Sequence, residues 1–478
     1  MHAPRTSRTR SIVACLVVLA GARVALAAAQ ERPVERPIDE VLSEYVAAGL
    51  AGNLALQREN FSVEQSLAAL QEARGRYLPA ASLEMRASRA SGGRTIELPL
   101  GDLLNPVYST LNDLLAAQGQ PPAFGTIQNT EFRFLREKEQ QTFVRVTQPL
   151  YAPAISAGVD ARSAQADAQR ATRETVARTL VRDIRVGYHQ WMSSREGLAI
   201  VDASRELLAE NLRVSRSLHD NGRVTRDQVL RAQAELLDVE QQRVEAANRV
   251  DITRSYFNFL LNRPLEAPVE PAVLPTLLSP NLAALEQLQR RAVQERSELR
   301  QLAAGADAAR AEVDAARARF KPVVALAVES GIQGEEFSTG PDDDYSIASL
   351  TFSWSLFNGN QDRARLAQAR LAARSLEVQH EASVSRIALE VEQAHGNAQA
   401  ALRAVTTAEA RQEAAREAFK IAARKRDAGT ISQVEFLDAR TTLTGAELNY
   451  TLTRFELLSR LAELDFARGT PAPAEVAK

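Results

Sequence analysis

The sequence predicts a mainly α-helical fold of long antiparallel coiled-coil hairpins, with four amphipathic β-strands and a tandem internal duplication. Three observations predict it. Two long stretches, residues 154–263 and 342–470, contain no proline and are rich in helix-forming residues. Short runs in which apolar and polar residues alternate interrupt this helical pattern. The spacing between glycines and prolines also repeats along the chain, which indicates two copies of one unit.

The composition of the 478 residues narrows the possible functions. Aromatic residues make up only 5%, so a large aromatic-walled ligand cavity is not expected. The single cysteine, Cys15, excludes an intrachain disulfide and a thiol-ligated metal site. Four of the 58 basic residues lie among the first 29, which contain no acid, so the remainder carries 54 basic and 60 acidic side chains. This net charge of −6 disfavours a nucleic-acid partner.

Residues 1–29 have the pattern of a secretory signal peptide. Three arginines precede an apolar run at residues 11–22, and small residues follow at 25–29, just before Gln30. The apolar run is too short for a transmembrane anchor, and Cys15 follows the last of the three arginines too closely for a lipoprotein signal. We therefore expect export with cleavage near Gln30. No later run is long enough for a spanning helix, so we expect β-strands to make any membrane crossing.

Repeated intervals reveal the duplication. Each half contains two intervals of 42 residues: Pro37 to Pro79 and Gly222 to Pro264, then Pro280 to Pro322 and Gly429 to Pro471. The local sequences match in the same register, since Arg74-Gly-Arg-Tyr-Leu-Pro79 corresponds to Arg317-Ala-Arg-Phe-Lys-Pro322. A tandem duplication is the simplest explanation.

The duplication gives the expected domain boundaries. After the signal peptide, residues 30–263 form the first repeat, residues 264–280 a proline-rich linker, residues 281–470 the second repeat and residues 471–478 a tail. The first repeat is longer by 37 residues, because Pro79 to Tyr151 spans 72 residues and Pro322 to Phe357 spans 35. We place these extra residues in an enlarged, proline-rich loop near residues 99–136.

Each repeat is expected to end in a long helical hairpin. Residues 154–220 would form a rod of about 100 Å at 1.5 Å per residue. Gly222 and Gly429 suit a helix C-terminus with positive φ, and Thr225 or Asp227 and Ser432 can cap the returning helices. Beyond the second turn, apolar residues recur every seven positions, as coiled-coil packing requires: Phe436, Leu443, Tyr450, Leu457 and Leu464. The first repeat matches this pattern except at Arg243.

Four alternating runs predict strands with one apolar and one polar face. They lie near residues 82–88, 144–149, 324–329 and 348–356. In an exported chain, such strands fit lipid on one face and water on the other. Four strands are too few to close a barrel, since spanning barrels begin at eight, so a conduit requires several chains.

These features resemble the TolC family of outer-membrane efflux proteins over nearly all of the expected mature chain. The resemblance rests on Asn53-Leu-Ala-Leu56, Arg74-Gly-Arg-Tyr-Leu-Pro79, Gln148-Pro-Leu-Tyr151, Trp354-Ser-Leu-Phe-Asn-Gly359, Ala428-Gly-Thr-Ile-Ser432 and Phe436-Leu-Asp-Ala439. It implies a homotrimer in the outer membrane of a Gram-negative bacterium, with four strands per chain in one 12-stranded β-barrel. It also implies an α-barrel through the periplasm that docks, through a periplasmic adaptor (membrane fusion protein), onto an inner-membrane transporter.

The resemblance also assigns roles to residues at the two helical turns. It makes Gly222, Arg223 and Val224, together with Gly429, Thr430 and Ile431, the periplasmic tips that meet the adaptor. The other interpretation is an ordinary turn between two helices, which applies in either case. Glu435 and Asp438 match acidic positions that line the periplasmic entrance in family members, and three chains would bring six carboxylates together. A solvated acidic face is the alternative.

The sequence departs from the family at one feature of the tips. Arg426 stands where an aromatic residue is often found, and Ile431 where a basic residue can form a pair. The resemblance therefore leaves open how this chain holds its closed periplasmic end.

The resemblance predicts a passive exit duct rather than an enzyme. The five histidines are scattered, nucleotide-binding and hydrolase motifs do not occur in a fitting context, and no cofactor or metal is expected. Small-molecule efflux, as in multidrug pumps, is the leading prediction. Type I protein secretion and metal-ion efflux are the alternatives. A periplasmic coiled-coil adaptor or scaffold is the rival from another class, but an adaptor would have one hairpin rather than two with strands between them.

Overall fold

A computed structural model describes residues 36–275, 280–337, 340 and 343–473 of the chain. The predicted signal peptide, its cleavage site and most of the C-terminal tail therefore lie outside the described residues. The first half of the fold contains α1 (Ile38–Gly52), α2 (Leu54–Gly75), β1 (Ala80–Arg89), β2 (Thr95–Leu98), α3 (Leu100–Ala117), β3 (Thr130–Arg133), β4 (Lys138–Tyr151), α4 (Pro153–Asp220) and α5 (Arg226–Leu260). The second half contains α6 (Leu285–Glu295), α7 (Ser297–Ala318), β5 (Val323–Gly334), β6 (Asp344–Ser353), α8 (Gln361–Asp427) and α9 (Gln433–Ala467).

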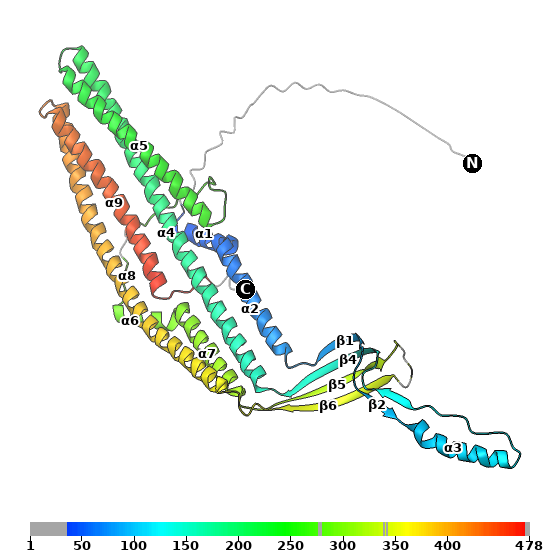
Figure 1. Ribbon diagram of the computed structural model, residues 1–478. Helices are drawn as coiled ribbons and strands as arrows, with labels where there is room; N and C mark the ends of the chain where they lie inside the picture. The colour runs from blue at the N-terminus through cyan, green and yellow to red at the C-terminus, as the bar shows by residue number, and fades with distance from the viewer. Residues whose placement is uncertain (1–35, 276–279, 338–339, 341–342, 474–478) are drawn as a thin grey trace, which may run out of the picture.

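Apart from β2, α3 and β3, the two halves repeat the same elements in the same order, which confirms the predicted duplication. Helices α2 and α7 both have 22 residues, and α5 and α9 both have 35. The long helices α4 and α8 have 68 and 67 residues. Each long helix runs from the sheet to the far end of the molecule, where it turns back into α5 or α9 (Figure 1). Among the described residues, none of the helices combines the length and the apolar character that crossing a membrane requires.

Four antiparallel strands form one sheet in the order β1-β4-β5-β6, so β1 and β6 are its edges. The predicted alternation is confirmed by the register. Val146 pairs with Ala81 and with Val328, and Val328 pairs with Ala348, so one row across the four strands is apolar. Further apolar side chains on this face are 65–70% exposed: Leu83, Met85, Leu350 and Phe352. On the opposite face, Arg145 forms ion pairs with Glu84 at 3.0 Å and Glu329 at 2.7 Å.

The enlarged segment near residues 99–136 has more regular structure than a loop. It contains all of α3 and all of β3, which pairs with β2 to form a separate two-stranded sheet. The four prolines near this segment favoured a loop at the sequence level. The structure accommodates them because Pro99 precedes the helix, Pro121 and Pro122 follow it, and only Pro106 lies inside. The apolar periodicity of residues 100–115 was the signal for a helix.

Four of the five predicted heptad positions of α9 are buried, as the sequence predicts. Phe436, Leu443, Leu457 and Leu464 of α9 are all at most 5% exposed. The exception predicted in the first repeat, Arg243 in α5, points away from the apolar packing and pairs with Asp202 of α4 at 2.6 Å. The largest apolar core lies where α1 crosses α4 and α5, and its centre is formed by Tyr188 and Phe257, both 0% exposed.

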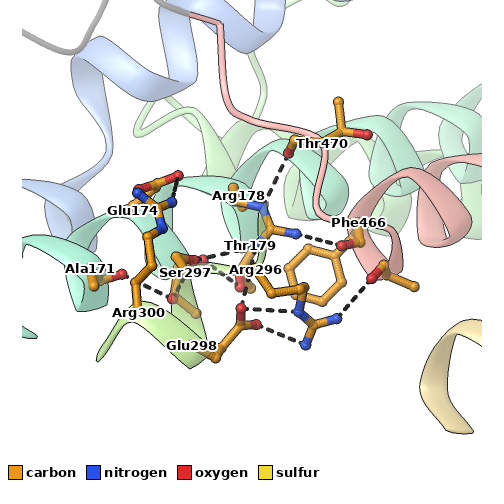
Figure 2. Close-up of polar contacts among 12 residues, drawn as sticks. Ala171, Glu174, Arg178, Thr179, Arg296, Ser297, Glu298, Arg300, Phe466 and Thr470 are labelled. Carbon is orange, nitrogen blue, oxygen red and sulfur yellow. Dashed lines mark hydrogen bonds and ion pairs between the residues drawn. The ribbon is translucent and has the colours of Figure 1, made fainter. Parts of the chain in front are cut away.

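A buried polar clamp joins the two repeats at the C-terminal end of α9 (Figure 2). Arg178 of α4 donates to the carbonyls of Phe466 at 2.5 Å and Thr470 at 3.1 Å. Arg296, between α6 and α7, donates to the carbonyl of Ala467 at 3.2 Å. Both guanidinium groups lie against the Phe466 ring, and both pair with Glu298. The clamp therefore supplies donors and positive charge to the carbonyl end of a helix, where both stabilise it.

Candidate functional site

The two helical turns lie side by side at the end of the molecule opposite the sheet, and they have the same backbone geometry (Figure 1). Gly222 and Gly429 have φ of 69° and 70°, which favours glycine because a Cβ is strained there. In each turn, the glycine N–H donates to a carbonyl three residues back at 2.8 Å. The next residue, Arg223 or Thr430, donates at 2.8 Å to the carbonyl five residues back. Both turns thus close their long helices in the same way.

The returning helices differ in how they begin. Ser432 forms a capping box with Glu435: the Glu435 N–H donates to the Ser432 hydroxyl at 3.2 Å, and the Ser432 N–H donates to the Glu435 carboxylate at 3.3 Å. Thr225 occupies the corresponding position before α5, but its side chain makes no capping hydrogen bond. The predicted cap at Ser432 is confirmed. In the first repeat, Thr225 stands at the N-cap position, but its side chain does not cap the helix.

A small core holds the two hairpins together next to the turns. Val201 and Leu208 of α4 pack with Phe436 and Leu437 of α9. The Phe436 ring also meets the Phe419 ring of α8, with centroids 5.6 Å apart. The core therefore combines side chains of both repeats, so neither turn is positioned by its own hairpin alone.

Arg426 links the hairpins directly. Its guanidinium lies 3.9 Å from the centroid of the Phe436 ring and donates to the side-chain oxygen of Asn211, on α4, at 3.2 Å. Asn211 is 3% exposed, and its amide nitrogen has no partner among the described residues. Arg426 was identified from the sequence as a departure from the resembled family, whereas Asn211 was not identified. The available signal was a polar residue beside Leu208 and Leu212 in the apolar stripe of α4.

The predicted tip residues differ in accessibility. Gly222, Arg223, Gly429 and Thr430 are exposed. Val224 is half-buried, and its carbonyl lies 3.0 Å from Nδ1 of His219. Ile431 and Val224 occupy equivalent positions, and Ile431 packs against the apolar core next to the turns. Ile431 therefore supports its turn from the inside, while the four exposed residues form the outer surface of the two turns.

The predicted acidic pair lies at the start of α9. Glu435 and Asp438 are both exposed and stand one helical turn apart. The carboxylate of Glu435 is held by the capping box, so this residue has a structural role as well as a charge. Within the described part of the chain, no group of three His, Cys, Asp or Glu side chains could hold a metal ion.

Comparison with known proteins shows which family has a similar sequence. Residues 288–470 match the family model described as "Outer membrane efflux protein". The matched region runs from within α6 to just beyond α9 and so covers most of the second repeat. An outer membrane efflux protein is a passive channel and not an enzyme, and it lies in the outer membrane of Gram-negative bacteria and extends into the periplasm. No curated protein sequence matches this efflux protein.

Solved channels share the fold of this efflux protein over nearly its whole length. The outer-membrane channel OprN is 19% identical, with a TM-score of 0.72, over 90% of each chain. The CmeC channel of Campylobacter jejuni is 15% identical, with a TM-score of 0.74, over 92% of this chain and 88% of CmeC. The VceC protein of Vibrio cholerae is 15% identical, with a TM-score of 0.71, over 90% of this chain and 97% of VceC. These likenesses confirm the predicted fold class.

The efflux protein also contains a cavity of about 670 Å³ among α4, α5 and α9, which was not predicted from the sequence. Apolar side chains such as Val201, Leu452 and Phe455 line it together with charged ones such as Arg249 and Glu463. His189 of α4 also lines the cavity, is 4% exposed and has no partner at Nδ1 among the described residues. Burial, together with the nearby charge of Arg185, lowers the pKa of His189 to about 3.

Proposed function

We propose that this efflux protein is the exit duct of a tripartite pump and exports small molecules. In this proposal three copies associate, their sheets close into one 12-stranded β-barrel in the outer membrane, and their hairpins form a tunnel through the periplasm. A periplasmic adaptor meets the tips, and an inner-membrane transporter supplies the energy.

One observation carries the proposal: the four-stranded sheet is incomplete as it stands. Its edge strands, β1 and β6, each have one side unpaired within the described chain. Its apolar face carries large side chains that are about two-thirds exposed, such as Leu83 and Phe352. Unpaired backbone groups are costly in lipid, so a sheet that lies in a membrane has to close. Pairing β6 of one copy with β1 of the next would satisfy both edges and present the apolar face to lipid.

The two helical turns suit the adaptor-docking role. The exposed outer surface at Gly222 and Arg223 lies beside the equivalent surface at Gly429 and Thr430. The duplicated backbone geometry offers two equivalent docking positions per chain, and three chains would present six. Ile431 would contribute by supporting its turn.

The acidic pair suits an entrance ring. In a trimer, Glu435 and Asp438 of three chains would give six carboxylates near one axis, a field that favours cations. Cationic small molecules are therefore the proposed cargo class. The three methionines, Met1, Met85 and Met192, offer no series of thioether ligands for a soft metal ion, so metal efflux ranks lower.

The test combines assembly and selectivity. We expect native mass spectrometry of the detergent-purified protein to give a trimer. In planar bilayers under a salt gradient, the parent channel should prefer cations, and Glu435→Gln with Asp438→Asn should lose much of that preference. Glutamine can keep the capping box, so the double variant should still assemble.

Two results would contradict the proposal. Recovery of a monomer only would exclude the shared barrel. A trimer whose reversal potential is unchanged in the double variant would assign both acids to a solvated face and remove the entrance ring, while leaving the duct itself in place.

A further inference from the structure

A folded arm projects from the sheet at the end of the molecule farthest from the hairpin turns (Figure 1). It consists of β2, α3, the segment after α3 and β3, and it is inserted between β1 and β4. The second repeat has no equivalent, since β5 and β6 are joined by residues 335–343 alone. The arm therefore accounts for most of the length difference between the repeats.

Three asparagines fix the arm internally. Asn105 pairs with the backbone of Ile127, donating at 2.8 Å and accepting at 2.9 Å. Asn112 donates to the Phe124 carbonyl at 2.8 Å and accepts from the Phe124 N–H at 3.1 Å. Asn129 accepts from the first N–H groups of α3, at 3.0 and 3.2 Å. The segment after α3 therefore covers one face of that helix and holds it in place.

A second face of α3 is apolar and uncovered. Successive residues of a helix are rotated by about 100°, so Asn105, Tyr108, Asn112 and Leu115 share the face that the returning segment covers. The polar residues Asp102, Ser109 and Asp113 share another face. The remaining stripe is apolar, and its members are 36–65% exposed: Leu100, Leu103, Leu104, Val107, Leu111 and Leu114. A contiguous apolar stripe of this kind marks an interaction surface.

The spacing of this stripe fits packing against other helices. Leu100, Val107 and Leu114 are seven residues apart, and Leu104 and Leu111 lie at the intermediate positions that complete the heptad. The stripe is continuous with the proposed interface between copies, because the arm begins directly after β1, an edge strand of the sheet. Three copies around one axis would therefore bring three such helices to the same end of the molecule.

The negative charge of the arm disfavours lipid as the partner of the apolar stripe of α3. The arm, residues 95–133, contains four acids, Glu97, Asp102, Asp113 and Glu131, and one base, Arg133. Amphipathic helices that lie on anionic membrane surfaces are rich in Lys and Arg on their polar face. An acidic arm would be repelled by such a surface, whereas the uncharged stripe of α3 brings no like charges together when copies meet.

We propose that the apolar stripe of α3 packs against α3 of the other two copies, forming a three-helix cluster over the outer mouth of the channel. This inference rests on the proposed trimer. The cluster would narrow the exit with apolar side chains and would reinforce the trimer beyond the sheet.

Disulfide cross-linking tests the cluster. In a Cys15→Ser background, Val107→Cys places a thiol on the apolar stripe, and Ser109→Cys places one on the polar face as a matched control. In a parallel cluster the same heptad position meets itself, so Val107→Cys should give a disulfide-linked dimer on a non-reducing gel under mild oxidation. Ser109→Cys should not. Adding Leu103→Glu and Leu114→Glu to Val107→Cys should abolish the dimer while native mass spectrometry still detects a trimer.

The outcomes separate this inference from the proposed function. A trimer in which Val107→Cys gives no more dimer than Ser109→Cys overturns the cluster and leaves the duct in place. In that case, an environment-sensitive fluorophore attached to the thiol of the Val107→Cys variant that reports an apolar surrounding in lipopolysaccharide-containing vesicles would assign the stripe to lipid. Absence of a trimer would overturn both proposals.

Discussion

His189 is a buried histidine that stays neutral in the folded protein. Its imidazole lines the cavity among α4, α5 and α9, and burial keeps its pKa near 3. An unfolded chain would bind a proton at this residue at its ordinary pKa of about 6.5. The folded state is therefore favoured above pH 6.5, and this contribution falls as the pH drops toward 3. Burial also raises the pKa of nearby Glu196, which opposes the trend at lower pH.

We predict that replacing His189 flattens the acid dependence of stability. For one such histidine, the free energy of unfolding falls by about 1.4 kcal/mol per pH unit at the steepest. His189→Met removes the titrating group and keeps a side chain of similar size, so it should melt at nearly the same temperature at pH 7 and pH 5. The wild-type and a His395→Gln control, a change at a partly exposed histidine, should both melt lower at pH 5. Equal shifts in all three proteins would show that another group controls the dependence.

Arg426 is the residue that we expect to hold the periplasmic end closed. It stacks on Phe436 and donates to Asn211, so it joins the second hairpin to the first. Arg426→Ala removes both contacts, and single-channel recordings should show a higher conductance or longer open times. The control is Arg424→Ala, which removes an exposed guanidinium from the same last turn of α8. An unchanged conductance in Arg426→Ala would mean that the contact does not limit opening.

At the level of elements, the two returning helices differ in their caps, and this difference is measurable. Ser432→Ala breaks the capping box and should lower the free energy of unfolding by about 1 kcal/mol. Thr225→Ala changes the equivalent position, where the side chain makes no capping bond, and should cost much less. Denaturant unfolding followed by circular dichroism can compare the two. Equal losses would mean that Thr225 also caps its helix in solution.

The elements that the sequence predicts well are those whose residues follow a strict period. The heptads of α9, the alternation of the four long strands and the glycines of both turns all specify local geometry, and the structure agrees with each. The arm was missed because its prolines outweighed the apolar stripe from Leu100 to Leu114. The contact between Arg426 and Asn211 was also beyond the sequence, because it joins residues 215 positions apart. Its geometry depends on how the two hairpins pack.

At the level of the whole molecule, the polar clamp around Phe466 holds the two repeats together. Arg178 is 2% exposed, and its guanidinium bonds to two carbonyls at the end of α9 and pairs with Glu298. Removing this side chain would leave the Thr470 carbonyl without its donor and the Phe466 carbonyl with the Gly469 N–H alone. Burial lowers the pKa of Arg178, but an arginine remains charged at any physiological pH.

We predict that Arg178→Met lowers the free energy of unfolding by about 3 kcal/mol. Arg182→Met is the matched control. The Arg182 guanidinium also faces the Phe466 ring, at 4.6 Å, but it is about one-third exposed and pairs with the adjacent Asp183. Its loss should cost at most about 1 kcal/mol. Melting of the detergent-solubilised protein can measure both, and equal effects would mean that the buried bonds to α9 add nothing beyond ring stacking.

The position of this clamp along α4 makes the helix a lever. The 43 residues from Arg178 to the last residue of the helix, Asp220, continue without a break for about 63 Å. If the clamp serves as the fulcrum, a rotation of α4 by about 5° moves the turn at Gly222 by about 5 Å, the pitch of one helical turn. Helix α8 has nearly the same length and reaches the same end. A partner that binds the tips could therefore widen the proposed periplasmic entrance through a small rotation of α4, while the packing around Arg178 stays almost unaltered.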